Sequence, residues 1–165
     1  MLSVVIPSLG GNLHSSLEAL NSGSLVPDEI IICLPNRKYS VDELNKNIKV
    51  IYSNKHGQVF QRIHGFKEAK GEKIISLDGD RQNDPKDIIK LVEAMGNSDL
   101  ICGWRKERKD TFFKRLISKT ANAIRSSVCK DGLHDTGCTL KVYRRSALLS
   151  IPTFNGMHRF LPALF

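Results

Sequence analysis

The chain has 165 residues, of which 41% are hydrophobic and 25% charged, and these proportions are ordinary for a globular protein. The length predicts a single domain over residues 1–165, and no run approaches the roughly eighteen apolar residues that a transmembrane helix needs. The formal net charge of +8 indicates an anionic partner. Because Met1 leads directly into a strand-like run, we expect no signal peptide and a cytoplasmic location.

Short apolar runs typical of strands alternate with segments of helical periodicity along the chain. The predicted strands are Ser3–Ile6, Glu29–Cys33, Ile48–Tyr52, Ile74–Leu77, Asp99–Cys102 and Cys138–Val142. The predicted helices are Asn12–Leu20, Gln58–Ala69, Lys86–Met95, Asp110–Val128 and Arg144–Leu149. This alternation predicts an α/β fold with a mostly parallel, Rossmann-like sheet that helices cover on both faces.

Four polar segments follow directly after predicted strands. They are Pro7-Ser8, Leu34-Pro35, Lys55–Gln58 and Asp78–Asp80. Ligands of parallel sheets bind outside the carboxyl ends of the strands. We therefore expect these segments to form one rim and to line one binding site.

The sequence Asp78-Gly79-Asp80 closes the fourth predicted strand, which reads as buried on both faces. In an extended backbone, residues two apart project to the same side, so both carboxylates can face one point. Gly79 lets backbone and ligand approach closely, and Gln82 can add a neutral oxygen. Two carboxylates with open positions for phosphate oxygens are typical of Mg²⁺ or Mn²⁺ beside a nucleotide diphosphate. The alternative is that this segment is only a polar turn.

Two common nucleotide-binding motifs are absent from the sequence. The loop after the first predicted strand, PSLGGN, lacks the G-x-G-x-x-G spacing of a dinucleotide-binding protein, and no G-x-x-x-x-G-K-[ST] occurs. A nucleotide site without either motif, but with a D-x-D pair, indicates nucleotide-diphosphate-sugar chemistry.

The positive charge is concentrated in one segment, Trp104–Arg145, which has twelve Lys or Arg against four Asp or Glu, a net +8. The rest of the chain balances, with thirteen of each sign. Phosphate groups, an anionic membrane surface or nucleic acid are candidate partners, and a solvated basic helix is the alternative.

The four cysteines form no C-x-x-C pair, so we interpret them as reduced and mostly buried.

Six segments of the sequence together resemble one known family. They are SVVIPS, GQVFQRIHGFKEAKGEKIISLDGD, DLICGWRKER, KRLISKTAN, DTGCTLKVYRR and GMHRFLPAL. In this order they resemble the family 2 glycosyltransferases with the GT-A fold, and within them the polyprenyl-phosphate enzymes similar to dolichol-phosphate mannose synthase. The resemblance implies a metal-dependent, inverting transfer of a sugar from a UDP- or GDP-linked donor to dolichyl or undecaprenyl phosphate.

The resemblance also implies roles for individual residues. The cation ligands would be Asp78, Asp80 and Gln82, with Asp80 also counted as catalytic. The nucleotide would be lined by Pro7, Ser8, Lys55, Gln58, Asp78 and Gly79, and covered by His158 and Arg159. The acceptor phosphate would be held by Arg105, Lys114, Arg115 and Ser118. The protein would associate peripherally with the cytoplasmic face of an anionic membrane, and nucleic acid is not an expected partner.

Three features depart from the family pattern. Leu9-Gly10-Gly11-Asn12 replaces an Asn-Glu pair, and Cys33-Leu34-Pro35-Asn36 replaces the aspartates that help to hold the nucleoside. Many relatives also continue into interfacial or membrane-spanning helices, so we expect this chain to be a catalytic domain without that extension.

The nature of the acceptor stays open at this point. A phosphate monoester is ionised at pH 7 and needs no general base, whereas a glycan hydroxyl needs a carboxylate to take its proton. Asp135 is the candidate base, and by resemblance it lies near the reaction centre; the alternative is a turn-capping residue. A third hypothesis is a basic anion- or membrane-binding module without enzymatic activity.

Overall fold

The computed structural model describes the chain except for short gaps and one longer one. The described residues are 1–10, 13–23, 25–41, 46–55, 57–79, 85–104, 138–154, 157 and 160–165. The strands are β1 (Leu2–Pro7), β2 (Glu29–Leu34), β3 (Ile48–Tyr52), β4 (Lys73–Ser76), β5 (Leu100–Cys102) and β6 (Lys141–Arg144). The helices are α1 (His14–Ser22), α2 (Gln58–Glu68), α3 (Pro85–Ala94), α5 (Arg145–Ser150) and α6 (Leu161–Leu164).

The strands form one six-stranded sheet in the order β3-β2-β1-β4-β6-β5. β1 pairs in parallel with both β2 and β4, and β2 pairs in parallel with β3. β6 pairs antiparallel with both β4 and β5. Successive strands run outward from β1 to β3, and the chain then crosses to β4 on the other side of β1. The carboxyl ends of β1, β2, β3 and β4 therefore meet at one edge, as the sequence predicted.

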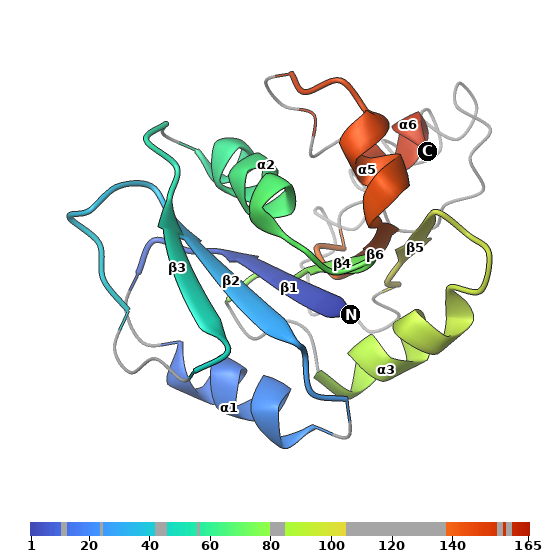
Figure 1. Ribbon diagram of the computed structural model, residues 1–165, viewed down its shortest axis with the longest axis horizontal. Coiled ribbons are helices and arrows are strands. Elements are labelled where there is room, and N and C mark those ends of the chain that lie inside the picture. Colours follow the sequence, from blue (N-terminus) through green and yellow to red (C-terminus); the bar gives the residue numbers. More distant parts are fainter. Residues whose placement is uncertain are drawn as a thin grey trace, which may run out of the picture.

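Helices cover both faces of this sheet (Figure 1). One core cluster includes Val4, Ile6 and Ile75 and faces α1 and α3, whereas another includes Val5 and Ile74 and faces α2, α5 and α6. In β1 and β2, consecutive residues are buried on opposite faces, so these two central strands are mostly apolar rather than alternating. The mostly parallel α/β sheet predicted from the sequence is confirmed.

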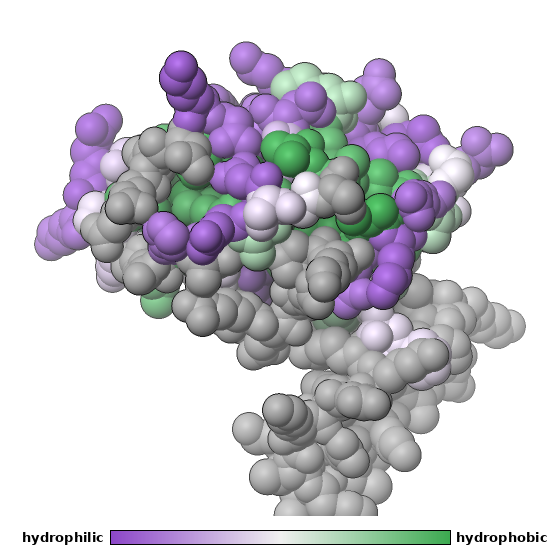
Figure 2. All heavy atoms as spheres, turned by 90° about the horizontal axis from the view of Figure 1, so that it is seen from below, coloured by the Kyte–Doolittle hydropathy of each residue, from purple (hydrophilic) through white to green (hydrophobic). Residues whose placement is uncertain are grey.

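Figure 2 shows the face of the molecule that points downward in Figure 1. In the upper part of this view hydrophilic side chains form most of the outline, and hydrophobic residues show mainly between them. Among the helices that the structure describes, none combines the length and hydrophobicity that crossing a bilayer would require.

Most predicted boundaries agree with the structure within two residues, but the last strand differs. The sequence predicts Cys138–Val142, whereas β6 begins at Lys141. The carbonyl of Cys138 accepts a hydrogen bond from the Lys141 ammonium, and the carbonyl of Leu140 accepts one from the amide of Gly103. The Gly103–Leu140 bond comes one step after the Cys102–Lys141 pair, so it continues the pairing of β5 with this segment beyond the start of β6. The predicted basic helix Asp110–Val128, and Asn12 as the cap of the first helix, lie outside the described residues.

Gly65 sets how closely α2 packs on the sheet. A Cβ at this position would lie 2.6 Å from Sγ of Cys33 and closer still to Val5. Overpacking costs about 1–3 kcal/mol, more than the ~1 kcal/mol that alanine gains over glycine inside a helix. We expect Gly65→Ala to lower the free energy of unfolding in urea. Gly23→Ala is the control, because a Cβ there would come no nearer than 3.4 Å to its neighbours, and equal stability of the two variants would contradict the prediction.

Candidate active site

The segments that follow β1 to β4 are joined to one another by main-chain hydrogen bonds. The amide of Ser8 donates to the carbonyl of Cys33 (3.0 Å), and the amide of Ser53 donates to that of Leu34 (2.8 Å). The amide of Leu77 donates to the carbonyl of Val5 (3.1 Å). The predicted rim is thus a continuous edge, on which Ser8, Ser53 and the start of the Asp78-Gly79 turn lie in register.

Gln61 of α2 ties two strand ends together from the side. Its side chain is buried, and its Nε2 donates to the carbonyls of Ser8 and Cys33, both at 2.6 Å. The sequence analysis did not find this residue, because its helical pattern was read from the apolar positions alone. Gln61 fixes the backbone at Ser8, which is one of the predicted nucleotide-lining residues.

Arg62, the next residue of α2, forms an ion pair with Asp78. Its Nη2 donates to Oδ1 of Asp78, and the two side chains are only 9% and 16% exposed. Oδ2 of Asp78 makes no hydrogen bond to the described residues, and the Nε of Arg62 is buried without a partner among them. The sequence assigned Asp78 to the cation and to the nucleotide, but one of its oxygens is already engaged by the guanidinium of Arg62, which no sequence pattern indicated.

Gly79 has a packing role in addition to the one predicted for it. A Cβ at this position would lie 2.6 Å from Cδ2 of Leu13, at the start of α1. The hydroxyl of Ser16 lies 3.5 Å from the carbonyl of Gly79. The sequence assigned this glycine to close approach of a ligand, whereas in the structure the glycine lets the turn after β4 rest against α1.

Lys55 and Gln58 are exposed at the end of the rim that follows β3. The Oγ of Ser53 closes the turn, donating to the carbonyl of Lys55 (2.9 Å) and accepting from its amide (3.3 Å). The ammonium of Lys55 lies 5.3 Å from the ring centroid of Phe60, on α2. Lys55 therefore contacts the outer side of α2 as well as the rim.

Not all basic residues of the segment Trp104–Arg145 lie on the surface. Lys141 is buried, opposite Ser76 of β4 and Cys102 of β5. Arg144 pairs with Asp99 (2.9 Å). Lys141 and Arg144 thus make contacts within the sheet, and the rest of the predicted basic face, from Arg105 to Lys130, stays a prediction because it lies outside the described residues.

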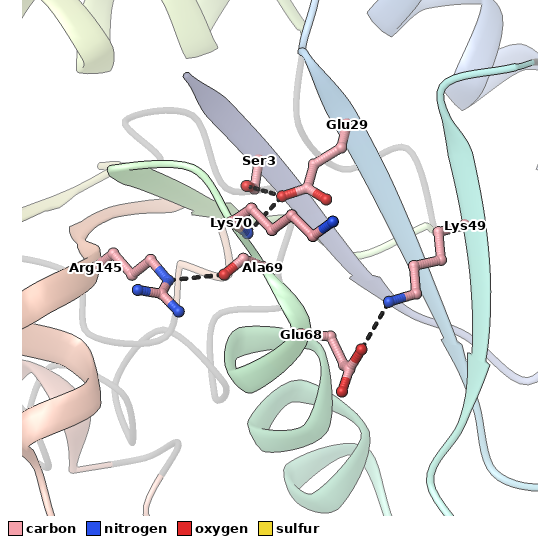
Figure 3. Close-up of polar contacts among 7 residues, drawn as sticks. All are labelled: Ser3, Glu29, Lys49, Glu68, Ala69, Lys70 and Arg145. Atoms are coloured by element: carbon pink, nitrogen blue, oxygen red, sulfur yellow. Dashed lines mark hydrogen bonds and ion pairs between the residues drawn. The ribbon is translucent and has the colours of Figure 1, made fainter.

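The opposite edge of the sheet carries structural polar contacts (Figure 3). Glu29 accepts hydrogen bonds from the Ser3 hydroxyl (2.5 Å) and the Lys70 amide (2.6 Å), and Arg145 donates to the carbonyl of Ala69 (2.7 Å). These bonds fasten the connection from α2 to β4 against β1, β2 and α5. They lie far from the carboxyl ends of the parallel strands and belong to the framework.

The described cysteines are reduced and form no disulfide, as the sequence predicted. Cys33 and Cys138 are buried and Cys102 is partly buried. Burial raises the pKa of the Cys33 thiol to about 12. Cys33 therefore stays protonated near neutral pH, which suits a packing role rather than a nucleophilic one.

Several predicted site residues lie outside the described residues, and their roles stay predictions. They are Asp80, Gln82, Arg105, Lys114, Arg115, Ser118, Asp135, His158 and Arg159. The structure brings Ser8, Asp78 and Gly79 to one edge and adds Gln61 and Arg62 beside them. Trp104, which follows β5, is exposed.

The sequence profile described as glycosyl transferase family 2 matches residues 3–151. The chain belongs to this family. It is 44% identical over 110 residues to the dodecaprenyl-phosphate galacturonate synthase of Rhizobium johnstonii, covering 65% of this chain and 32% of that protein. It is 33% identical over 123 residues to the undecaprenyl-phosphate 4-deoxy-4-formamido-L-arabinose transferase of Aeromonas hydrophila, covering 74% and 38%. The chain thus spans about a third of the length of these relatives.

Solved structures of other proteins share the fold. One is the glucosyl-3-phosphoglycerate synthase of Mycobacterium tuberculosis in complex with Mn²⁺, UDP-glucose and phosphoglyceric acid. It matches with a TM-score of 0.65 at 14% sequence identity, over 92% of this chain and 59% of that one. The likeness at this identity is one of fold, which is the GT-A fold that the sequence resemblance implied.

Proposed function

We propose that this chain is the catalytic domain of a metal-dependent, inverting glycosyltransferase that moves a sugar from a nucleotide diphosphate to a polyprenyl phosphate. The observation that carries the proposal is that Asp78 and Gly79, which Asp80 follows in the sequence, lie at the carboxyl edge of the sheet in a family 2 domain. The names of the two relatives above, both polyprenyl-phosphate enzymes, support the acceptor. The proposed place of action is the cytoplasmic membrane face.

The donor set suits a hard divalent cation such as Mg²⁺ or Mn²⁺. Carboxylate and amide oxygens are the ligands that such ions prefer, and Asp78, Asp80 and Gln82 supply them. Among the proposed cation ligands, Asp78 is the one that the structure describes. Its Oδ2 makes no hydrogen bond to other described residues, so this oxygen can bind a cation or accept a hydrogen bond from a ribose hydroxyl. When bound, the cation would neutralise charge on the departing diphosphate.

The described residues around the turn would position the binding groups rather than take part in the reaction. Arg62 holds one carboxylate oxygen of Asp78, so the other points in a fixed direction. Gln61 fixes the backbone of Ser8 and the end of β2, which form the opposite wall of the rim. Arg105, Lys114, Arg115 and Ser118 are the proposed acceptor-phosphate residues, and His158 and Arg159 the proposed cover over the diphosphate.

The proposed reaction can be tested by a transfer assay. The protein, with Mg²⁺ or Mn²⁺, is offered a panel of UDP- and GDP-linked sugars together with a short soluble prenyl phosphate or a glycan acceptor. Transfer to the prenyl phosphate is expected, with inversion at the anomeric carbon. Transfer to the glycan alone would replace the phosphate acceptor by a hydroxyl, and binding of anions without any transfer would favour a binding module.

The role of Asp135 separates the two acceptor types. A phosphate acceptor has a second pKa of about 6 and is ionised at pH 7, so Asp135→Asn should cost only what orientation contributes. With a hydroxyl acceptor, loss of the base typically costs about 10²–10⁴-fold in rate. The measurement is the pH–rate profile of both proteins on one acceptor, with Asp131→Asn as the control. An acidic limb that is present in the wild type and absent from Asp135→Asn would contradict the phosphate acceptor.

A further inference from the structure

Lys141 is a buried cation to which the proposed reaction assigns no role. It is 6% exposed, and in the sheet it lies opposite Ser76 of β4 and Cys102 of β5. Its ammonium donates a hydrogen bond to the carbonyl of Cys138, three residues earlier in the chain. Burying an ammonium costs free energy because the charge leaves water, so the effect of this charge on its surroundings has to be considered.

Lys141 lies on the α2 side of the sheet. Side chains two residues apart on a strand project to the same face, and Tyr143, two residues after Lys141, belongs to the core cluster that faces α2, α5 and α6. Ser76, its partner on β4, projects to the same face. Arg62 reaches Asp78 from α2, so the ion pair and Lys141 are on one side of the sheet.

The ammonium of Lys141 points toward the carboxyl edge. β6 runs antiparallel to β4, so Cys138, which precedes β6, lies beyond the end of β4, where Asp78 also lies. Asp78 comes two residues after Ser76, the partner of Lys141. Strands about 4.8 Å apart and a rise of about 3.3 Å per residue place the Cα atoms of Lys141 and Asp78 on the order of 8 Å apart. The Lys141 side chain extends in this direction, because its acceptor, the Cys138 carbonyl, lies there.

Lys141 and Arg62 are two buried cations at the same edge. Burial raises the pKa of Tyr143, and the charge of Arg62 partly offsets this effect, so Arg62 lies close to the residue that neighbours Lys141 on its face. Asp78 is the one acid at the carboxyl edge among the residues that the structure describes. Salt screens buried charges much less than surface charges, so both cations act on whatever binds beside Asp78.

We propose that Lys141 supplies positive charge to the group that binds beside Asp78, and that it thereby favours a diphosphate there and opposes a divalent cation bound by itself. The inference rests on the proposed function only in identifying this anion with the diphosphate of the donor. Lys141 is thus a binding residue that acts by its charge, in addition to the hydrogen bond by which it holds the Cys138 carbonyl.

The test is calorimetric titration of the full chain with two probes, inorganic diphosphate in the presence of a chelator and Mn²⁺ alone. Lys141→Gln removes the charge but keeps a side-chain N–H that can donate to the Cys138 carbonyl. We expect it to weaken diphosphate binding roughly tenfold and to strengthen Mn²⁺ binding at least as much, as loss of a unit charge about 8 Å away implies at an effective dielectric constant of about 20. A purely structural role would weaken both probes or neither.

Lys73→Gln is the matched control. Lys73 is partly buried at the amino end of β4, and its ammonium also donates to a main-chain carbonyl, that of Val92 (3.3 Å). The substitution makes the same charge change at the opposite edge of the sheet and should alter neither affinity. Urea unfolding checks that both variants fold. Lys141→Met is the second variant at this site, because replacing a buried charge by an apolar side chain is often neutral or stabilising.

Four results would overturn the proposal. They are a wild-type protein that binds no diphosphate in the presence of a chelator, a folded Lys141 variant with unchanged diphosphate affinity, one in which Mn²⁺ affinity does not rise, and equal effects of Lys73→Gln. Failure of the proposed reaction would be a separate result, because these titrations involve no sugar transfer. Conversely, transfer to a prenyl phosphate together with unchanged affinities in Lys141→Gln would contradict only the role of Lys141.

Discussion

Asp80→Ala should abolish cation-dependent nucleotide binding while leaving the protein folded. We expect the core not to need Asp80, because in the sequence it comes after the buried residues of β4 and Leu77. With one of two proposed carboxylate ligands removed, we expect the effect of Mn²⁺ on UDP or GDP affinity to fall by at least about 100-fold, the upper end of what loss of a supporting ligand group costs. Calorimetric titration with and without the cation measures this, and circular dichroism checks the fold.

Asp87→Ala is the matched control for this experiment. Asp87 lies in the first turn of α3, is half exposed, and pairs with Lys90 at 2.9 Å on the surface. Its removal changes the charge of the protein by the same amount, close in sequence to the Asp78-Gly79-Asp80 turn. Cation-dependent affinity that survives in a folded Asp80→Ala protein would show that this turn is not the cation site.

Arg62→Met should both destabilise the protein and impair transfer. The substitution leaves Asp78 as a largely buried carboxylate without its partner, which we expect to lower the free energy of unfolding by about 2–3 kcal/mol. The value lies below that of a fully buried pair, because the Asp78 side chain keeps 16% of its surface exposed. Urea unfolding measures the stability, and the transfer assay measures the activity.

Asp78→Asn combined with Arg62→Met separates the two effects. The double variant removes both charges, so it should recover most of the lost stability, but it should stay inactive because the oriented carboxylate is gone. Lys49→Met is the control, since the Lys49–Glu68 pair is about half exposed and such pairs contribute at most about 1 kcal/mol. Stability losses of equal size in Arg62→Met and Lys49→Met, or full activity of the double variant, would contradict the role we assign to this pair.

Asp78 and Asp80 can be recognised from the sequence, whereas the role of the buried Gln61 cannot. Asp78 and Asp80 stand directly after an apolar run, so local order alone marks them. Gln61 sits within a helical pattern, and its two acceptors, Ser8 and Cys33, are 53 and 28 positions away along the chain. A polar residue on a helix is ordinarily solvated, so only the approach of the strand ends reveals that this one is buried.

Among the described residues, the sequence by itself determined the strands and all helices except α6 to within a few residues, the two-faced cover of the sheet and the meeting of the strand ends at one edge. It could do so because these features depend on apolar periodicity and on the rule that ligands of parallel sheets bind at the carboxyl ends. Tertiary structure alone decided that Arg62 holds Asp78, that Lys141 is buried and that Gly79 rests on α1. Each of these depends on contacts between segments distant in the sequence, and such contacts cannot be inferred from local composition.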